Sequence, residues 1–106
     1  MSTNANSPKQ GPFLVLMALL NGPKHGYEIA KHIEEKSNGL FKMPFGTLYP
    51  ILHRLEKQAY VTVEDERSSA RPKKIYKLTK EGKSQANNEI GEFQLFVKTL
   101  NKMVRI

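Results

Sequence analysis

The last quarter of the chain carries an apolar pattern that the rest of the chain is too short to cover. From residue 80 onward, apolar side chains recur at alternating spacings of four and three residues, and Phe96 and Met103 widen the stripe; the repeating positions are Ala86, Ile90, Phe93, Val97, Leu100 and Val104. This spacing predicts one helix of roughly 25 residues, about 38 Å long. The preceding core of about seventy residues is too small to bury such a stripe along its whole length.

The uncovered part of this helix is expected to pack on a second copy of the chain. A two-fold dimer would bury the same stripe on both copies, against the last helix or the first helix of the partner. The predicted dimer interface consists of Phe13, Met17, Ile90, Phe93, Val97, Leu100 and Val104.

Three shorter helices are predicted ahead of this long one. Residues 1–10 are mostly small and polar, so we expect a flexible tail. Helical apolar stripes over about 12–21, 26–37 and 45–58 are separated by Asn-Gly-Pro and Ser-Asn-Gly turns. The short apolar stretch 40–44 is predicted to connect the second and third helices, with room for a one- or two-residue strand.

The third helix presents a polar face beside its buried leucines. Apolar residues at the i, i+3, i+4 and i+7 positions, from Leu48 to Leu55, form the buried stripe. The outward face and its flanks carry side chains that can contact DNA bases or phosphates, namely Thr47, Tyr49, Pro50, His53, Arg54 and Lys57. When this segment is considered alone, a solvated helix face is the alternative.

A hairpin with a basic outer part follows the third helix. Residues 60–64 and 74–78 are rich in β-branched and aromatic side chains, which predicts two strands. Five basic residues and no acidic ones occur between Arg67 and Lys77, and the whole chain has a net charge of +7. This charge favours a phosphate-rich partner. We expect Arg71, Lys73 and Lys74 to contact a nucleic-acid backbone.

The order helix, helix, helix, hairpin is that of a winged helix-turn-helix. It predicts a mainly α (α+β) fold, with a DNA-binding domain over residues 11–78 and a C-terminal dimerisation helix over 79–106. In this arrangement the third helix enters the major groove of double-stranded DNA and the hairpin, or wing, contacts the backbone. The start of the second helix offers free amides for one more phosphate, near His25 and Tyr27.

Three segments resemble the signature blocks of the PadR family of transcriptional regulators. They are PKHGYEI at 23–29, GTLYPILHRLE at 46–56 and KIYKLTKEG at 74–82. The resemblance covers roughly residues 12–106. Within the family, the chain resembles the short subfamily, which has a single C-terminal helix. It implies a ligand-responsive repressor that binds DNA as a homodimer in the cytoplasm.

Some small members of this family bind flat apolar compounds at the dimer centre, using an aromatic residue from the last helix. This chain has no Trp. Phe93 and Phe96 are the candidates to stack on a small aromatic or apolar effector, with Phe13 and Met17 as walls. Packing within the dimer seam is the alternative role for both phenylalanines.

Enzymatic and membrane functions have little support in the sequence. His25, His32 and His53 have no Cys or carboxylate at metal-ligand spacing, so no metal or cofactor site and no catalytic residue is predicted. The chain has no Cys, and its longest apolar run is far shorter than the roughly 20 residues that span a bilayer. A winged-helix dimer that senses a small apolar ligand or binds a protein, without specific DNA binding, is the alternative function.

Overall fold

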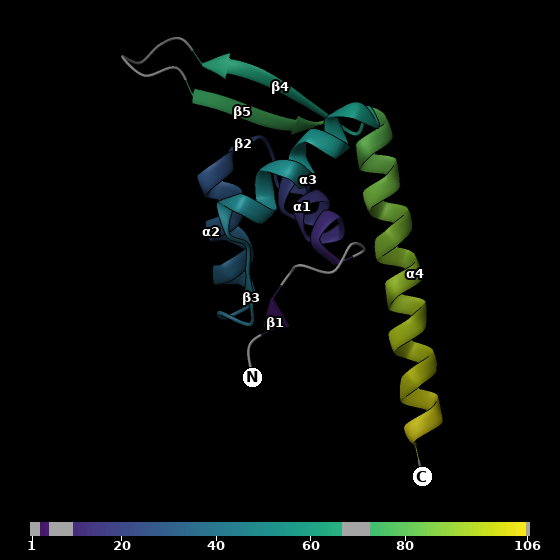
Figure 1. The fold of residues 1–106 in the computed structure, drawn as a ribbon. Helices are drawn as coiled ribbons and strands as arrows, with labels where there is room; N and C mark the ends of the chain where they lie inside the picture. Colours follow the sequence, from purple (N-terminus) through teal and green to yellow (C-terminus); the bar gives the residue numbers. More distant parts are fainter. Residues whose placement is uncertain (1–2, 5–9, 67–72, 106) are drawn as a thin grey trace.

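Helices and strands follow one another in the predicted order. The computed structural model describes residues 3–4, 10–66 and 73–105. Its elements are β1 (Thr3–Asn4), α1 (Gln10–Leu20), β2 (Lys24–His25), α2 (Gly26–Lys36), β3 (Phe41–Lys42), α3 (Phe45–Lys57), β4 (Val61–Glu66), β5 (Lys73–Leu78) and α4 (Lys80–Val104). In Figure 1, α1 to α3 pack together, the β4–β5 hairpin projects from them, and α4 runs down one side. The predicted mainly helical winged helix-turn-helix fold is confirmed.

The core lies between α1, α2, α3 and the inner face of the hairpin. Its largest fully buried side chains are Val15, Leu16, Ile29, Leu48, Leu52 and Val61. The buried residues of α3 are those of the predicted stripe, Leu48, Ile51, Leu52 and Leu55. Because this stripe is fully used in the core, the opposite face of α3 is directed to the outside.

The sheet contains a short strand that the sequence pattern did not reveal. β4 and β5 form an antiparallel hairpin in which Val61 pairs with Leu78. β2, with only two residues, pairs with the other edge of β5, so that His25 lies opposite Ile75. Two residues are too few to show strand periodicity, which explains why this segment was predicted only as the start of α2.

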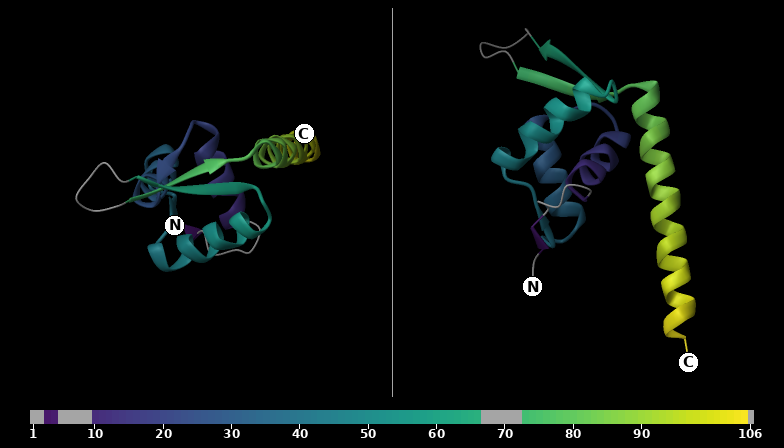
Figure 2. Two further views of the ribbon diagram at one scale, coloured as in Figure 1. Left: turned by 90° about the horizontal axis from the view of Figure 1, so that it is seen from above. Right: turned by 45° about the vertical axis from the view of Figure 1, so that its right-hand side comes forward.

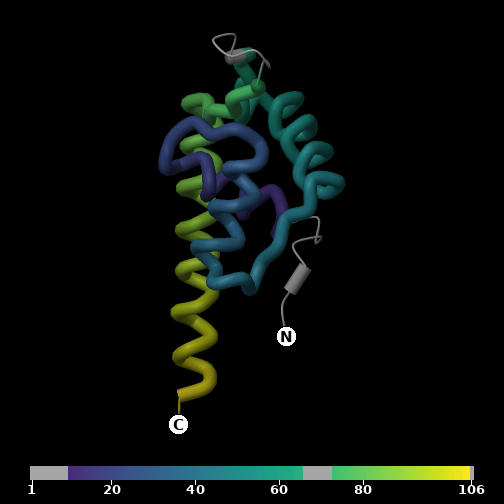
Figure 3. Tube along the Cα trace, turned by 90° about the vertical axis from the view of Figure 1, so that its left-hand side faces the viewer, coloured from purple at the N-terminus to yellow at the C-terminus, as the bar shows by residue number. Residues whose placement is uncertain are grey.

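A second pair of short strands joins the N-terminus to the α2–α3 connection. Thr3–Asn4 of β1 runs parallel to Phe41–Lys42 of β3, and Figure 1 shows these two strands beside each other. Figure 3 shows the α2–α3 connection, which contains β3, from another side. The α1 helix already begins at Gln10. The other residues of the predicted flexible tail, 1–2 and 5–9, lie outside the described ranges, so their flexibility stays a prediction.

The α4 helix continues well beyond the core. Its 25 residues match the predicted length, and Gly82 and Ala86, both in its first two turns, are its buried residues. Further along, Phe96 is 59% exposed and Met103 is 74% exposed. The molecule is 60 Å long but only 21 Å thick, and the right-hand view in Figure 2 shows α4 extending past the other helices.

Candidate nucleic-acid interface

The outward face of α3 carries most of the side chains predicted to read DNA. Thr47 is half-buried, and the exposed ones are Tyr49, Pro50, His53, Arg54 and Lys57. Gly46 is also exposed, so no side chain covers the face at the start of the helix. The helix can therefore present Pro50, His53 and Lys57 to a groove, and the role of each residue stays a prediction.

Pro50 lies inside α3 without ending it. A proline at this position removes the hydrogen bond that its amide would have donated to the Gly46 carbonyl. The first turn is held instead by the Pro44 carbonyl, which accepts from both Thr47 N and Leu48 N at 2.9 Å. Gly46 and Pro50 are both exposed, so this part of the helix faces away from the core.

Tyr49 connects α3 to the first residue of α2. A Cβ atom added to Gly26 would lie 2.6 Å from the Tyr49 hydroxyl, so glycine makes room for this side chain. The ring of Phe45 lies on another side, with centroids 5.9 Å apart. Tyr49 was predicted on a flank of α3, and the structure places that flank against the start of α2.

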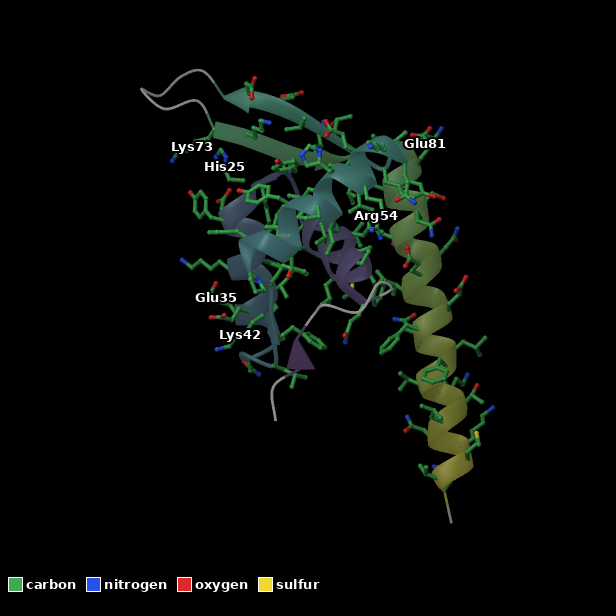
Figure 4. All side chains as sticks on the ribbon, in the orientation of Figure 1. His25, Glu35, Lys42, Arg54, Lys73 and Glu81 are labelled. Atoms are coloured by element: carbon green, nitrogen blue, oxygen red, sulfur yellow. The ribbon has the colours of Figure 1, made fainter. Side chains whose placement is uncertain are left out.

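The base of the wing meets the start of α2 at His25. Its Nδ1 atom lies 3.2 Å from the Lys74 carbonyl oxygen, to which it donates when protonated. The His25 ring is nearly parallel to the Tyr27 ring, with centroids 5.8 Å apart, and Lys73 Nζ lies 5.8 Å from the Tyr27 centroid. Figure 4 shows His25 and Lys73 side by side at this junction.

These contacts surround an open pocket of about 290 Å³ between α2, α3 and the wing. It is lined by His25, Gly26, Tyr27, Tyr49, Lys73, Lys74 and Tyr76. Burial, with smaller contributions from Tyr49 and Glu56, raises the pKa of Tyr76, so its hydroxyl stays neutral. The pocket thus combines tyrosine side chains with the Lys73 ammonium group, which lies near the Tyr27 ring, and hydroxyl and ammonium groups are suitable donors for a phosphate.

The side chains of the two wing lysines, Lys73 and Lys74, do not lie together as one doubly charged site. Lys73 and Lys74 are exposed successive residues of β5, so their side chains leave opposite faces of the hairpin. The register also places Glu66 opposite Lys73 and Asp65 opposite Lys74. The third predicted wing residue, Arg71, lies outside the described ranges.

Arg54 lies on the other flank of α3, away from the pocket. Figure 4 shows it between α3 and α4. With Gln58, Gln85 and Glu89 it lines a depression of about 310 Å³. The structure therefore brings Tyr49, His25, Tyr27 and Lys73 together with the backbone of Lys74. It leaves Arg54 nearer to α4.

Gly26 and Tyr76 are members of the pocket that sequence reasoning missed. Gly26 belongs to the first signature block, but its role as the space for Tyr49 depends on a contact between two helices. Tyr76 was predicted only as a strand residue, and its position follows from the hairpin register, in which it lies opposite Val63.

Comparison with known proteins identifies the family. The sequence model of the family described as "Transcriptional regulator PadR-like family" matches residues 15–88, which include the core, α3 and the wing. The chain belongs to the PadR-like family. This is a family of transcriptional regulators rather than of enzymes, and the resemblance seen in the three sequence blocks is confirmed.

Several transcriptional regulators are similar to this chain, with sequence identities between 24% and 33%. A transcriptional regulator from Clostridium thermocellum has a TM-score of 0.78 and 31% identity, over 89% of this chain and 92% of that one. Escherichia coli YqjI, a transcriptional regulator, is 33% identical over 69 residues, 65% of this chain and 32% of its own length. Bacillus subtilis PadR, solved with operator DNA, has a TM-score of 0.68 at 24% identity, over 74% of this chain and 45% of that one.

The described part of this PadR-like chain contains neither a cluster of metal ligands nor a membrane-spanning helix. Among residues 3–4, 10–66 and 73–105, no group of three or more His, Cys, Asp or Glu side chains could hold a metal ion. None of the helices in these ranges is long and apolar enough to cross a membrane.

Proposed function

We propose that this chain is a sequence-specific, double-stranded DNA-binding repressor that acts as a homodimer in the cytoplasm. The observation that carries the proposal is the continuous surface formed by α3, the start of α2 and the base of the wing. On it, exposed His53 and Lys57 lie on the helix that would enter the major groove, while Lys73 and His25 lie beside it at the wing.

The division of this surface into two parts fits base recognition and backbone contact. Pro50 and His53 are exposed on the outward face of α3, where they can contact base edges. The lysines of the wing supply positive charge, which attracts the phosphates of DNA whatever its sequence. The similar fold of B. subtilis PadR, which was solved with operator DNA, supports DNA as the partner.

The exposed seam of α4 supports the homodimer. Val97, Leu100 and Val104 lie on the same face as buried Ala86, yet they are 37%, 40% and 73% exposed in the single chain. An apolar stripe of this length in water is a marker of a protein interface. A second copy would cover it and also the exposed side of Met17 in α1.

The proposed effector is a small aromatic or apolar compound held near Phe93 and Phe96. Both rings are more than half exposed, and Phe93 already contacts Phe13 of α1. A flat compound between two copies of this aromatic pair would gain stacking contacts. A shift of α4 on binding would then change the separation of the two α3 helices.

The salt dependence of DNA binding tests the proposal. A dimer that neutralises about six phosphates should lose affinity with a slope near −5 in a plot of log affinity against log salt. Duplexes from the chain's own promoter region should bind more tightly than random duplexes at about 100 mM salt. Equal binding of both duplexes would contradict specific recognition, and would favour a winged-helix dimer that binds a ligand or a protein instead.

A further inference from the structure

Thr79 joins the end of α3 to the start of α4 through both its backbone and its side chain. Its amide donates to the Tyr60 carbonyl at 3.0 Å. Its hydroxyl donates to the Ala59 carbonyl at 2.6 Å and accepts from Gly82 N at 2.9 Å. The hydroxyl therefore acts as donor and acceptor at once, which no apolar side chain of the same shape can do.

The two carbonyls that Thr79 binds belong to the residues that end α3. Tyr60 N donates to Leu55 O and Ala59 N to Glu56 O, both at 3.0 Å, which is a Schellman motif. Ala59 has a φ of 63°, in the left-handed region that usually requires glycine. A strained residue of this kind keeps its conformation when its surroundings hold it from several sides.

The first turn of α4 lies directly on this turn of the chain. A Cβ atom added to Gly82 would overlap the Tyr60 carbonyl oxygen, so the two backbones are in contact. Figure 1 shows the end of α3 meeting the upper end of α4 at this point. Ala59, Tyr60, Thr79 and Gly82 form what we call the α3–α4 joint.

We propose that Thr79 is a positioning residue that sets the separation of the two α3 helices in the dimer. This inference rests on the proposed function, in which the partner binds α4 and DNA is read by α3. The joint holds the C-terminal end of α3 against the N-terminal end of α4. When the two α4 helices of the dimer pack in one arrangement, the joint therefore also sets the positions of both α3 helices. The separation of the α3 helices then decides the spacing of the half-sites that the dimer can bind.

Two substitutions break the joint in different ways. Thr79→Val removes both hydrogen bonds of the hydroxyl. Thr79→Asp keeps a good N-cap for α4, because a carboxylate accepts from Gly82 N, but it cannot donate to the Ala59 carbonyl. Thr79→Ser keeps both bonds and is the conservative control. Thr62→Val is the second control, because it makes the same chemical change as Thr79→Val at an exposed position of β4.

The first measurement is a distance across the DNA-free dimer. The chain has no Cys, so His53→Cys allows one spin label on each α3 helix, and electron–electron double resonance gives their separation. The parent, Thr79→Ser and Thr62→Val proteins should show one narrow distribution. Thr79→Asp and Thr79→Val should broaden it about two-fold, because α3 is no longer held to α4. An unchanged width in Thr79→Asp would overturn the proposal. This result would decide the question even if the Thr79→Val protein does not fold.

The second measurement uses DNA with altered spacing. Inserting two base pairs between half-sites rotates one of them by about 70°, given about 10.5 base pairs per turn. The unmodified dimer should lose about 100-fold in affinity as its second contact fails. Thr79→Asp should lose only about ten-fold, while its affinity for a single half-site is unchanged. Equal losses in both proteins would overturn the proposal.

These measurements separate this inference from the proposed function. If the unmodified protein is a monomer or binds all duplexes equally, the proposed function fails, and the proposed role of Thr79 in the dimer fails with it. If it is a dimer that prefers one spacing, and Thr79→Asp shows the same preference and the same label distance, only the role of Thr79 fails.

Discussion

Phe13 of α1 and Phe93 of α4 pack against each other within one chain, with ring centroids 5.9 Å apart and planes inclined by 43°. This contact divides the apolar stripe of α4 into two parts. Up to Phe93, the helix lies on its own domain, whereas Leu100 and Met103 lie beyond that contact and are exposed. The second part is the one that a partner would cover.

Leu100→Asp should convert the dimer into a monomer, because it places a charge in the stripe that the partner buries. Sedimentation velocity would measure the change. Leu95→Asp is the matched control, since Leu95 is 65% exposed and lies about 140° around the helix from Leu100. A dimer that survives Leu100→Asp would place the interface elsewhere.

Tyr49→Ala should weaken binding to the operator far more than binding to random duplex. Tyr49 carries no charge, so its loss changes base recognition and the position of α3 rather than the attraction to phosphates. We expect a specific loss of about 1–3 kcal/mol in a titration at fixed salt. Tyr49→Phe keeps the ring beside Phe45 and separates the role of the hydroxyl near Gly26. Equal losses on both duplexes would show that Tyr49 does not discriminate between sequences.

Lys73→Ala combined with Lys74→Ala should weaken binding to every duplex and reduce the salt slope by about two. The control is Lys98→Ala with Lys102→Ala, which removes the same charge from the far end of α4. Each double variant would be titrated at several salt concentrations. An unchanged slope in the wing variant would mean that these lysines do not contact DNA phosphates, as expected if Asp65, which lies opposite Lys74, already offsets the charge there.

Ala59→Gly should raise the free energy of unfolding by about 1 kcal/mol, because glycine adopts the left-handed conformation without the steric cost that alanine meets there. Ala30→Gly, in the middle of α2, should lower it by a similar amount, because glycine is unfavourable in a helix interior. Urea denaturation followed by circular dichroism would measure both. A loss of stability in Ala59→Gly would contradict the assignment of strain to this residue.

Gly82→Ala should destabilise the chain by about 1–3 kcal/mol, since the new methyl group would overlap the Tyr60 carbonyl oxygen. Gly91→Ala, in the same helix and with nothing within 4 Å of the new methyl group, should stabilise it by up to about 1 kcal/mol. Thermal unfolding would compare the two variants. Equal effects would mean that the first turn of α4 can move away from Tyr60.

Helix positions were largely predictable because they depend on short-range periodicity. The α4 helix begins at Lys80, where the apolar pattern predicts its start, and α3 occupies the stretch marked by its leucine stripe. The short strands β1 and β2 were not predicted, because a two-residue strand exists only through its pairing with a distant segment.

The sequence by itself determined the order of the elements, the face of α3 that turns outward and the length of α4, since each follows from residue spacing within one segment. The tertiary structure alone decided that His25 lies against the Lys74 backbone, that Tyr49 fills the space above Gly26, and that Thr79 binds Ala59. These contacts join residues 49, 23 and 20 positions apart. They depend on strand register and helix packing, which residue spacing within a single segment does not determine.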